Sequence, residues 1–218
     1  MENLGQFIEH TLLRQDAKTD EIIKLTDEAK EHRFKGVCVN PFYVKQVKEQ
    51  LYGTDILVVT VVGFPLGTST TESKAFEARD AVLNGADEID MVINVGALKN
   101  KDYDYVLDDI KGVKAACADK LLKVILETDL LDKDEIKKAS ELAAQAGADF
   151  VKTSTGFVKN GVGAKSEDVR LMKETVAPFG LEVKASGGIK DRATAVEMIN
   201  AGAARLGTSS GVAISCRD

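Results

Sequence analysis

The feature that most constrains the fold of this chain is a regular alternation of short apolar runs with amphipathic stretches of helical period. Some eight strand–helix units in this length predict a parallel sheet with right-handed crossovers. The first run is the weakest of the eight. The runs are Phe7–Thr11, Val37–Val39, Leu57–Val62, Glu88–Val92, Leu122–Leu126, Phe150–Lys152, Glu182–Ala185 and Arg205–Gly207.

Three glycines mark a weak internal repeat. Gly85, Gly147 and Gly202 each follow a helical stretch, where a left-handed residue is favoured, and each leads into a predicted strand. The two intervals between them each hold two strand–helix units. Ser69–Glu72 and Asp132–Glu135 resemble capping boxes, so we expect a helix to begin at each.

Strand parity favours a closed barrel over an open, doubly wound sheet. Successive strand residues face opposite sides, and an open sheet covered on both faces should have almost wholly apolar central strands. In a barrel, balanced charges can meet inside. The charges that share one parity are Glu88, Asp90, Lys123, Glu127, Lys152, Glu182 and Lys184. We therefore predict an α/β fold, a (β/α)8 TIM barrel, with its active site at the carboxyl ends of the strands.

Composition and charge narrow the classes of function. The chain has 29 Lys and Arg against 35 Asp and Glu, a formal net charge of −6 that disfavours a nucleic-acid partner. Its three cysteines form no CxxC pair, which predicts neither disulfides nor a zinc site. Residues 1–6 do not resemble a signal peptide, and no apolar stretch is long enough for a membrane span. We expect one cytoplasmic domain over residues 1–218, without a membrane partner.

The segment Phe150–Gly156 carries the strongest chemical signal. Lys152 is the last residue of a predicted strand, at a position whose side chain should face the barrel interior. Small hydroxyl residues and a glycine follow it. A Schiff-base nucleophile must be a neutral amine, so its pKa has to fall from roughly 10.4 through burial or a nearby cation. Lys184, on the next predicted strand, would supply that cation. A structural ion pair with a glutamate of the same parity is the competing interpretation, and spacing alone leaves both open.

The side chain of Asp90 is also predicted to face the barrel interior, and the residue lies near the end of its strand. A buried carboxylate beside an ammonium group can shuttle the protons that enamine chemistry requires. The same arrangement can be a salt bridge that only fixes a lysine, and the sequence leaves both interpretations open.

Two glycine-rich segments, Ser186–Ile189 and Gly207–Gly211, follow the seventh and eighth predicted strands. Loops at these places form the usual phosphate cradle of a (β/α)8 barrel, because glycine lets backbone N–H groups approach phosphate oxygens. Glycine and serine are also common in ordinary turns. Another segment, Gly161–Ser166, resembles part of a P-loop, but Ala164 and Asn160 occupy positions that require glycine.

Taken together, the motifs resemble those of deoxyribose-phosphate aldolases, and the match covers essentially the whole chain. The matching segments are Glu9–Leu13, Val37–Pro41, Val62–Gly67, Glu88–Asn94, Val151–Phe157, Val183–Ile189 and Leu206–Ser210. The resemblance implies a class I aldolase that needs no metal or other cofactor. It would cleave 2-deoxy-D-ribose 5-phosphate reversibly to D-glyceraldehyde 3-phosphate and acetaldehyde.

The resemblance also assigns residues to roles. Its Schiff-base lysine falls on Lys152, its proton-relay aspartate on Asp90 and its second lysine on Lys184. Its phosphate contacts fall on Gly156, Gly187, Gly188, Gly207, Ser209 and Ser210. The implied partners are small phosphosugar and aldehyde substrates, and the implied assembly is a homo-oligomer, either a dimer or a tetramer.

Three positions depart from the family pattern. Glu9 stands where the family usually has Asp, and Lys190 where it often has Arg. The given sequence ends at Ser215–Asp218, without the family's tail ending in Tyr, so proton exchange at the enamine is expected to be slower. None of the three departures removes the nucleophile.

Two alternative functions remain at this point. One is another Schiff-base barrel aldolase or a transaldolase, which would use dihydroxyacetone units in place of acetaldehyde. The other is a catalytically silent barrel that only binds a phosphosugar. The presence of Lys152, Asp90 and Lys184 together argues against the silent barrel.

Overall fold

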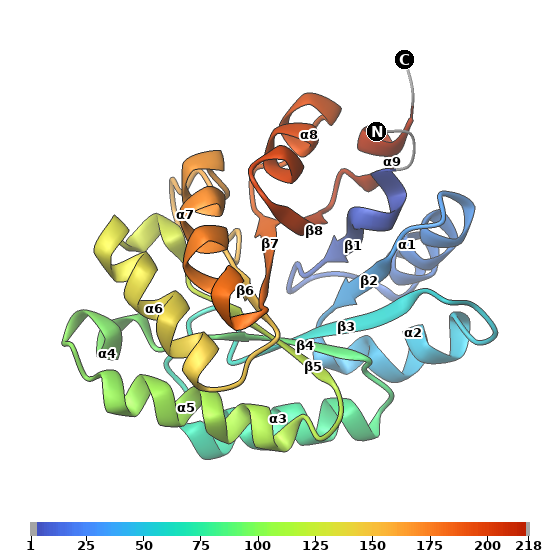
Figure 1. The fold of residues 1–218 in the computed structure, drawn as a ribbon. Coiled ribbons are helices and arrows are strands. Elements are labelled where there is room, and N and C mark those ends of the chain that lie inside the picture. The colour runs from blue at the N-terminus through green and yellow to red at the C-terminus, as the bar shows by residue number, and fades with distance from the viewer. Residues whose placement is uncertain (1–3, 217–218) are drawn as a thin grey trace.

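The computed structural model describes residues 4–216, so residues 1–3 of the chain start and 217–218 of the chain end lie outside it. Its eight strands form a closed parallel barrel in which each strand pairs with its neighbours in chain order and β8 pairs with β1 (Figure 1). The strands are β1 (Ile8–Leu12), β2 (Gly36–Val39), β3 (Leu57–Val62), β4 (Glu88–Val92), β5 (Leu121–Ile125), β6 (Phe150–Lys152), β7 (Glu182–Ser186) and β8 (Ala203–Thr208). The predicted (β/α)8 barrel is confirmed.

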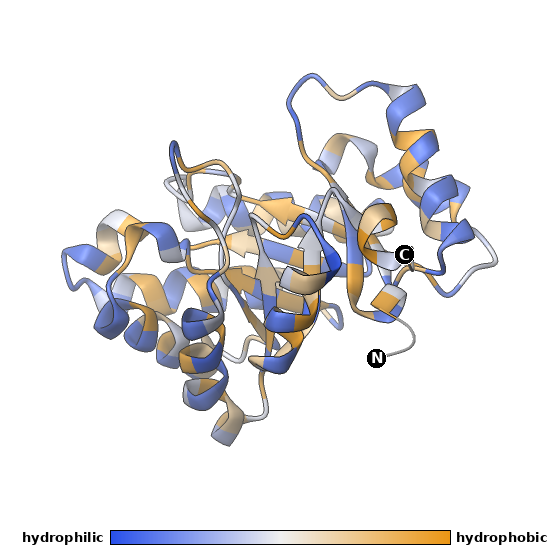
Figure 2. Ribbon diagram, turned by 90° about the horizontal axis from the view of Figure 1, so that it is seen from above, coloured by the Kyte–Doolittle hydropathy of each residue, from blue (hydrophilic) through white to orange (hydrophobic). Residues whose placement is uncertain are grey.

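Helices surround the barrel, with polar residues on their outer sides and apolar residues toward the strands (Figure 2). They are α1 (Thr19–Glu31), α2 (Val44–Gln50), α3 (Thr71–Leu83), α4 (Val95–Lys99), α5 (Tyr103–Ala116), α6 (Lys133–Gln145), α7 (Ser166–Val176), α8 (Arg192–Asn200) and α9 (Gly211–Ser215). Short 3-10 turns are η1 (Leu4–Phe7), η2 (Pro41–Tyr43), η3 (Thr128–Leu130) and η4 (Ala177–Phe179). The main apolar core lies between the barrel and this layer.

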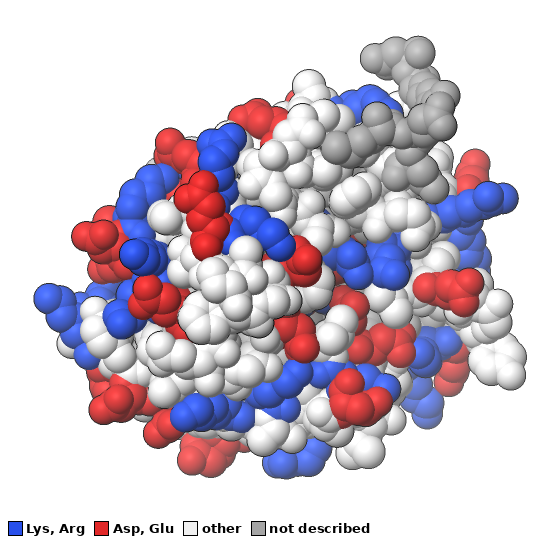
Figure 3. Space-filling model, in the orientation of Figure 1, with Lys and Arg blue, Asp and Glu red and all other residues white. Residues whose placement is uncertain are grey.

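On the face seen in Figure 3, charges of both signs are interspersed. In residues 4–216, no helix has the length and apolar character needed to cross a membrane.

The expected helix ends are mostly confirmed. Asp132 caps α6 with the reciprocal capping box, and the three repeat glycines have positive φ angles of 105°, 79° and 114°. The capping box expected at Ser69 is wrong by one residue. Thr70 caps α3 instead, and its hydroxyl accepts from the N–H of Ser73 at 3.3 Å. Adjacent hydroxyl residues offer the same capping chemistry, so sequence alone does not separate them.

The internal repeat has a structural cause at the amino ends of the strands. Asp87, just before β4, accepts from the N–H of Val58 on β3 at 2.9 Å and from Lys48 on α2 at 2.7 Å. Asp149, one repeat later, accepts from β5 at 2.8 Å and from Lys114 on α5 at 2.6 Å. Each aspartate therefore ties the start of its own strand to the preceding strand and to the helix that leads into that preceding strand. We call Lys48–Asp87 and Lys114–Asp149 the amino-end pairs.

Two acids expected inside the barrel lie elsewhere. Glu182, at the amino end of β7, has a side chain 45% exposed and pairs with Lys173 of α7 at 2.6 Å. Glu127 lies beyond the last residue of β5 and has a left-handed backbone with a φ of 63°. Alternation fixes the facing of a side chain only within a strand, so it does not hold for Glu127, past the end of β5. At the first residue of a strand it held for Glu88 of β4 but not for Glu182 of β7.

Candidate active site

Six charged side chains from five strands meet inside the barrel, and each of the six residues is at most 3% exposed. We call Glu9, Glu88, Asp90, Lys123, Lys152 and Lys184 the interior cluster. Asp90 lies at its centre. The Oδ2 atom of Asp90 is 2.8 Å from the Nζ of Lys152 and 2.6 Å from the Nζ of Lys184, while its Oδ1 is 3.1 Å from that of Lys123. The structure thus brings together all three residues to which the sequence assigned catalytic roles.

Glu9, Glu88 and Lys123 complete the cluster, although none of them was assigned a catalytic role from the sequence. Glu9 on β1 hydrogen-bonds Lys184 and lies 3.4 Å from Lys123. Lys123 also pairs with Glu88. Strand parity had predicted that Lys123 faces inward. The extra methylene of Glu9 relative to aspartate is compatible with direct contact with Lys184.

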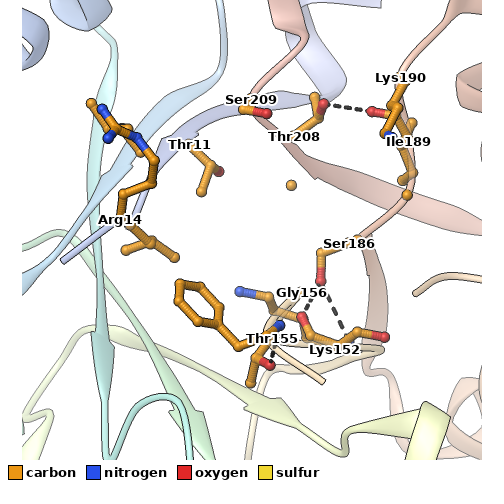
Figure 4. Close-up of a pocket in the computed structure, with 17 residues that line it drawn as sticks. Thr11, Arg14, Lys152, Thr155, Gly156, Ser186, Ile189, Lys190, Thr208 and Ser209 are labelled. Atoms are coloured by element: carbon orange, nitrogen blue, oxygen red, sulfur yellow. Dashed lines mark hydrogen bonds between the residues drawn. The ribbon is translucent and has the colours of Figure 1, made fainter. Parts of the chain in front are cut away.

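A cavity of about 450 Å³ opens at the carboxyl ends of the strands above the cluster. Among the described residues of the interior cluster, only Lys152 lines it. In Figure 4, Lys152 lies at one side of the open space, with Thr208 and Ser209 of the β8 end across from it. The free end of Lys152 can therefore meet a ligand while Asp90 and Lys184 stay buried beneath.

Five of the six residues assigned to phosphate binding line this cavity. They are Gly156, Gly187, Gly188, Gly207 and Ser209. Ser210 does not line it, and its N–H donates to the hydroxyl of Thr208 at 2.9 Å. Gly207 also lies against Lys184, because a Cβ atom there would be 3.0 Å from Cε of that lysine. A side chain at position 207 would therefore press on the cluster.

The three interior lysines differ in their affinity for a proton. Burial lowers the pKa of Lys152 below the usual lysine value and outweighs the attraction of Asp90, with the positive charge of Lys184 lowering it further. Burial also opposes the charged form of Lys184, but Asp90 and Glu9 outweigh it and raise the pKa well above its usual value. The same balance raises the pKa of Lys123 to about 12. Lys152 is thus the lysine that most readily becomes neutral.

The interior carboxylates are held ionised. Burial alone would raise the pKa of Asp90, but the charges of the three lysines outweigh it and hold the pKa well below its usual value. Lys123 and Lys184 lower the pKa of Glu9 in the same way against its burial. Both groups therefore begin as proton acceptors at neutral pH.

A count of charges also favours a neutral Lys152. The cluster holds three carboxylates, and Arg205 of β8 lies 3.7 Å from one of them, Glu9. Arg205, Lys123 and Lys184 together supply three positive charges. A charged Lys152 would be a fourth cation beside three carboxylates in a mostly buried site. Isolated buried charge is costly, so the cluster is balanced when Lys152 carries none.

Comparison with known proteins identifies the family of the chain. Residues 6–216 match the DeoC/LacD family of aldolases. The chain belongs to this family. It is 58% identical to a deoxyribose-phosphate aldolase of Brevibacillus brevis, covering 97% of this chain and 95% of the relative. It is 57% identical to a deoxyribose-phosphate aldolase of Staphylococcus carnosus, with 96% and 94% covered. The predicted family and class of enzyme are confirmed.

Solved structures of similar proteins agree on the fold of this DeoC/LacD aldolase. A putative deoxyribose-phosphate aldolase from Coccidioides immitis superposes with a TM-score of 0.95 at 46% identity, covering 98% of this chain and 84% of that one. A tetrameric deoxyribose phosphate aldolase from Aeropyrum pernix has a TM-score of 0.88 at 32% identity, with 98% and 90% covered.

Several cavity residues of this DeoC/LacD aldolase were assigned no role by reasoning from sequence, and Phe157 and Arg14 are two of them. Phe157 lines the cavity, and its ring centroid lies 5.2 Å from that of Phe64. Arg14 also lines it and pairs with Asp16 at 2.6 Å and with Glu21. Arg14 directly follows the first motif, at a strand's carboxyl end. That position is the signal that could have found it.

Proposed function

We propose that this aldolase cleaves 2-deoxy-D-ribose 5-phosphate reversibly to D-glyceraldehyde 3-phosphate and acetaldehyde through a Schiff base on Lys152. The observation that carries the proposal is that Lys152 lines the cavity, has a lowered pKa and contacts Asp90 at 2.8 Å. The names of the relatives at 58% and 57% identity support the substrate.

The neutral amine of Lys152 attacks the C1 aldehyde of the open-chain sugar, and loss of water from the carbinolamine gives an iminium ion. The C2–C3 bond then breaks. Its electron pair moves to the iminium as the C3 hydroxyl loses its proton, and D-glyceraldehyde 3-phosphate leaves. The remaining enamine takes a proton at C2. Addition of water then releases acetaldehyde and returns the free amine.

Asp90 and Lys184 serve the proton transfers. The ionised carboxylate of Asp90 accepts protons given up during carbinolamine formation and C–C cleavage, with a water molecule bridging to the substrate. Lys184 shares the Oδ2 atom of Asp90 with Lys152, and its positive charge keeps the amine of Lys152 neutral. The pair thus combines a proton acceptor with a fixed cation.

The phosphate group binds at the opposite side of the cavity, at the ends of β7 and β8. Gly187, Gly188 and Gly207 let the backbone approach the phosphate oxygens, and Ser209 adds a hydroxyl donor. Gly156 and the more distant Ser210 complete the set proposed from the sequence. Phosphate binding far from the reacting carbons orients the sugar and stabilises the transition state.

The chain acts as one domain over residues 1–218, with small phosphosugars and aldehydes as its partners. The family match over residues 6–216 supports a single functional unit. We place it in the cytoplasm. Its cysteines are free, and Cys216 among them is exposed, which suits a reducing compartment.

The aldolase assembles as a homo-oligomer, and the outer face of α3 supports contact between copies. Phe76 is 65% exposed and Leu83 is 83% exposed on this helix. About a two-fold axis between Arg79 and Asp80, Phe76 would lie opposite Leu83 of the second copy, and Arg79 opposite Asp80. Light scattering of the protein and of a Leu83→Glu variant tests this arrangement, and an unchanged mass for the variant would contradict it.

The Schiff base is tested by borohydride trapping with acetaldehyde, followed by intact mass and peptide mapping. We expect a single two-carbon adduct on Lys152, absent from Lys152→Ala and present in Lys114→Met, which removes a partly exposed lysine at the amino ends of the strands. An adduct on Lys184 would reverse the roles of the two lysines. A folded protein without any adduct would leave the phosphosugar-binding barrel as the function.

Substrate identity is tested separately by product analysis. Incubation with 2-deoxy-D-ribose 5-phosphate should release acetaldehyde and D-glyceraldehyde 3-phosphate in equal amounts. Transfer or release of dihydroxyacetone units from other phosphosugars, without release of acetaldehyde, would indicate a different Schiff-base aldolase.

A further inference from the structure

The segment Gly161–Ser166, which fails as a P-loop, spans the end of the loop between β6 and α7 (residues 153–165, the β6–α7 loop) and the first residue of α7. Its main-chain N–H groups at Val162 and Gly163 donate to the carboxylate of Asp129, at 3.1 and 2.7 Å. Asp129 lies on η3, in the connection between β5 and α6, and does not line the cavity. One carboxylate thus fixes two successive backbone groups of the next loop along the barrel.

The same part of the β6–α7 loop touches the proposed phosphate site through backbone alone. The N–H of Ala164 donates to the carbonyl of Gly187 at 3.0 Å. A Cβ atom on Gly163 would lie 2.4 Å from the carbonyl carbon of Gly187, and one on Gly188 would lie 2.4 Å from the carbonyl oxygen of Val162. No side chain separates the two loops at these contacts, so a shift of one must move the other.

The glycines of this segment therefore have a role unrelated to a P-loop. Gly161 makes room for Asp129, because a Cβ atom there would lie 2.7 Å from Oδ2. Gly163 makes room for the Gly187 backbone. Both bring the chain close to a partner on a neighbouring loop.

We propose that Asp129 is a positioning residue for the phosphate end of the active site. It fixes Val162 and Gly163, and these hold the backbone of Gly187 and Gly188 where the phosphate of the substrate binds. The inference rests on the proposed function, because it assumes a phosphate at the ends of β7 and β8. It assigns Asp129 no part in the chemistry at Lys152.

The test compares substrates with and without the phosphate. In Asp129→Asn, the amide oxygen can accept only one of the two N–H groups comfortably, while its NH₂ group faces the other. Gly163→Ala pushes a methyl group into Gly187. For both variants we expect the ratio of kcat/KM for deoxyribose 5-phosphate to that for deoxyribose to fall about tenfold, the size of effect of one lost charge-assisted hydrogen bond. Borohydride trapping of acetaldehyde on Lys152 should not change.

Matched variants control for general damage. Asp132→Asn makes the same chemical change three residues away, where the side chain only caps α6. Gly147→Ala carries the same left-handed backbone penalty as Gly163→Ala, with φ angles of 79° and 83°, but its Cβ atom meets nothing within 4 Å. Both controls should keep the substrate ratio within about twofold of the unmodified protein.

Each result has a distinct meaning. An equal loss for both sugars in Asp129→Asn and Gly163→Ala, or an unchanged ratio, would overturn the role of Asp129 while leaving the proposed function intact. If the unmodified aldolase shows no preference for the phosphorylated sugar, the proposed phosphate site is wrong and the positioning role is wrong with it. A selective loss in both variants and in neither control supports the inference.

Discussion

This barrel pairs lysines with carboxylates in two places, and the two places differ in how the partners are matched. At the amino ends of the strands, Asp87 and Asp149 each take one lysine and one strand N–H group. At the centre, Asp90 is shared by three lysines. The same residue types therefore form one-to-one pairs at one level of the barrel. At the other level, the three lysines together with Arg205 outnumber the three carboxylates of the interior cluster by one.

The way lysines and carboxylates are paired explains why one place is structural and the other reactive. The amino-end pairs are partly exposed, with side chains between 26% and 47% exposed, so water screens them and every group has a partner. The interior cluster is almost wholly buried, and with Arg205 counted its charges balance only when one lysine gives up its proton. Lys152 is that lysine. We infer that matched pairs hold the barrel together and that the surplus lysine carries the reactivity.

The strongest test of this comparison is Lys152→Met. We expect release of acetaldehyde to fall more than about 10⁴-fold, because the nucleophile is gone. The free energy of unfolding should change by less than about 1.5 kcal/mol, since a neutral amine is replaced by an apolar group of similar length. A coupled assay for acetaldehyde and urea unfolding measure the two effects.

The same variant also tests the structural ion pair that the sequence left open. If Lys152 were a charged partner of Asp90, its removal would leave a buried carboxylate short of a cation and cost about 3–5 kcal/mol. A loss of that size would contradict the neutral lysine.

Lys184→Met should have the next largest effect. At pH 7 we expect cleavage to slow by about 10²- to 10³-fold, within the range of a lost proton-transfer group. Lys184 lowers the pKa of Lys152, so its removal raises that pKa. The rate, which rises with pH as Lys152 loses its proton, should then level off at a higher pH than in the unmodified protein.

The pH dependence of borohydride trapping on Lys152 measures this shift directly. Lys190→Met, which removes an exposed lysine of the cavity, serves as the control for a general loss of positive charge. A slower enzyme with an unchanged pH profile would mean that Lys184 does not control the protonation of Lys152.

The sequence predicted the barrel and the centre of its site because both depend on strand periodicity. Lys152, Asp90 and Lys184 lie in strand interiors or at strand ends, where alternation fixes the facing of a side chain, and all three are where parity put them. Lys123 faces inward for the same reason. Those parts of the site could therefore be predicted before any coordinates.

The parts that the sequence did not predict lie in loops and at strand edges. Arg14 and Phe157 reach the cavity through backbone turns that no periodicity describes. Glu127 lies past its strand in a left-handed conformation, and Glu182 turns to a helix lysine at the barrel edge. The partners of Asp129 lie on another loop, 33 and 34 residues away along the chain. Such contacts depend on tertiary packing and have no local signal.

At the amino ends, Asp149→Ala should reduce stability and leave catalysis alone. It removes the ion pair with Lys114 and the acceptor for the N–H of Leu122, so we expect a loss of about 2 kcal/mol in the free energy of unfolding. Asp149→Asn keeps an acceptor for that N–H and should lose about half as much. Rates of acetaldehyde release from the folded variants should stay within about twofold, and a larger fall would show that the two ends of the barrel are coupled.

The smallest effect is expected from Lys48→Met. Its side chain is 47% exposed, so the ion pair with Asp87 is worth about 0.5 kcal/mol. Asp87 keeps the N–H of Val58, and the methionine stem can still pack on Gly85, beside which the Lys48 stem lies. The difference in free energy of unfolding between the variant and the unmodified protein should shrink further in 0.5 M salt, because salt screens an exposed ion pair. Urea unfolding at low and high salt measures it. A loss of more than about 1.5 kcal/mol in the free energy of unfolding, independent of salt, would mean that this ion pair behaves like a buried one. The contrast with the interior cluster would then be wrong.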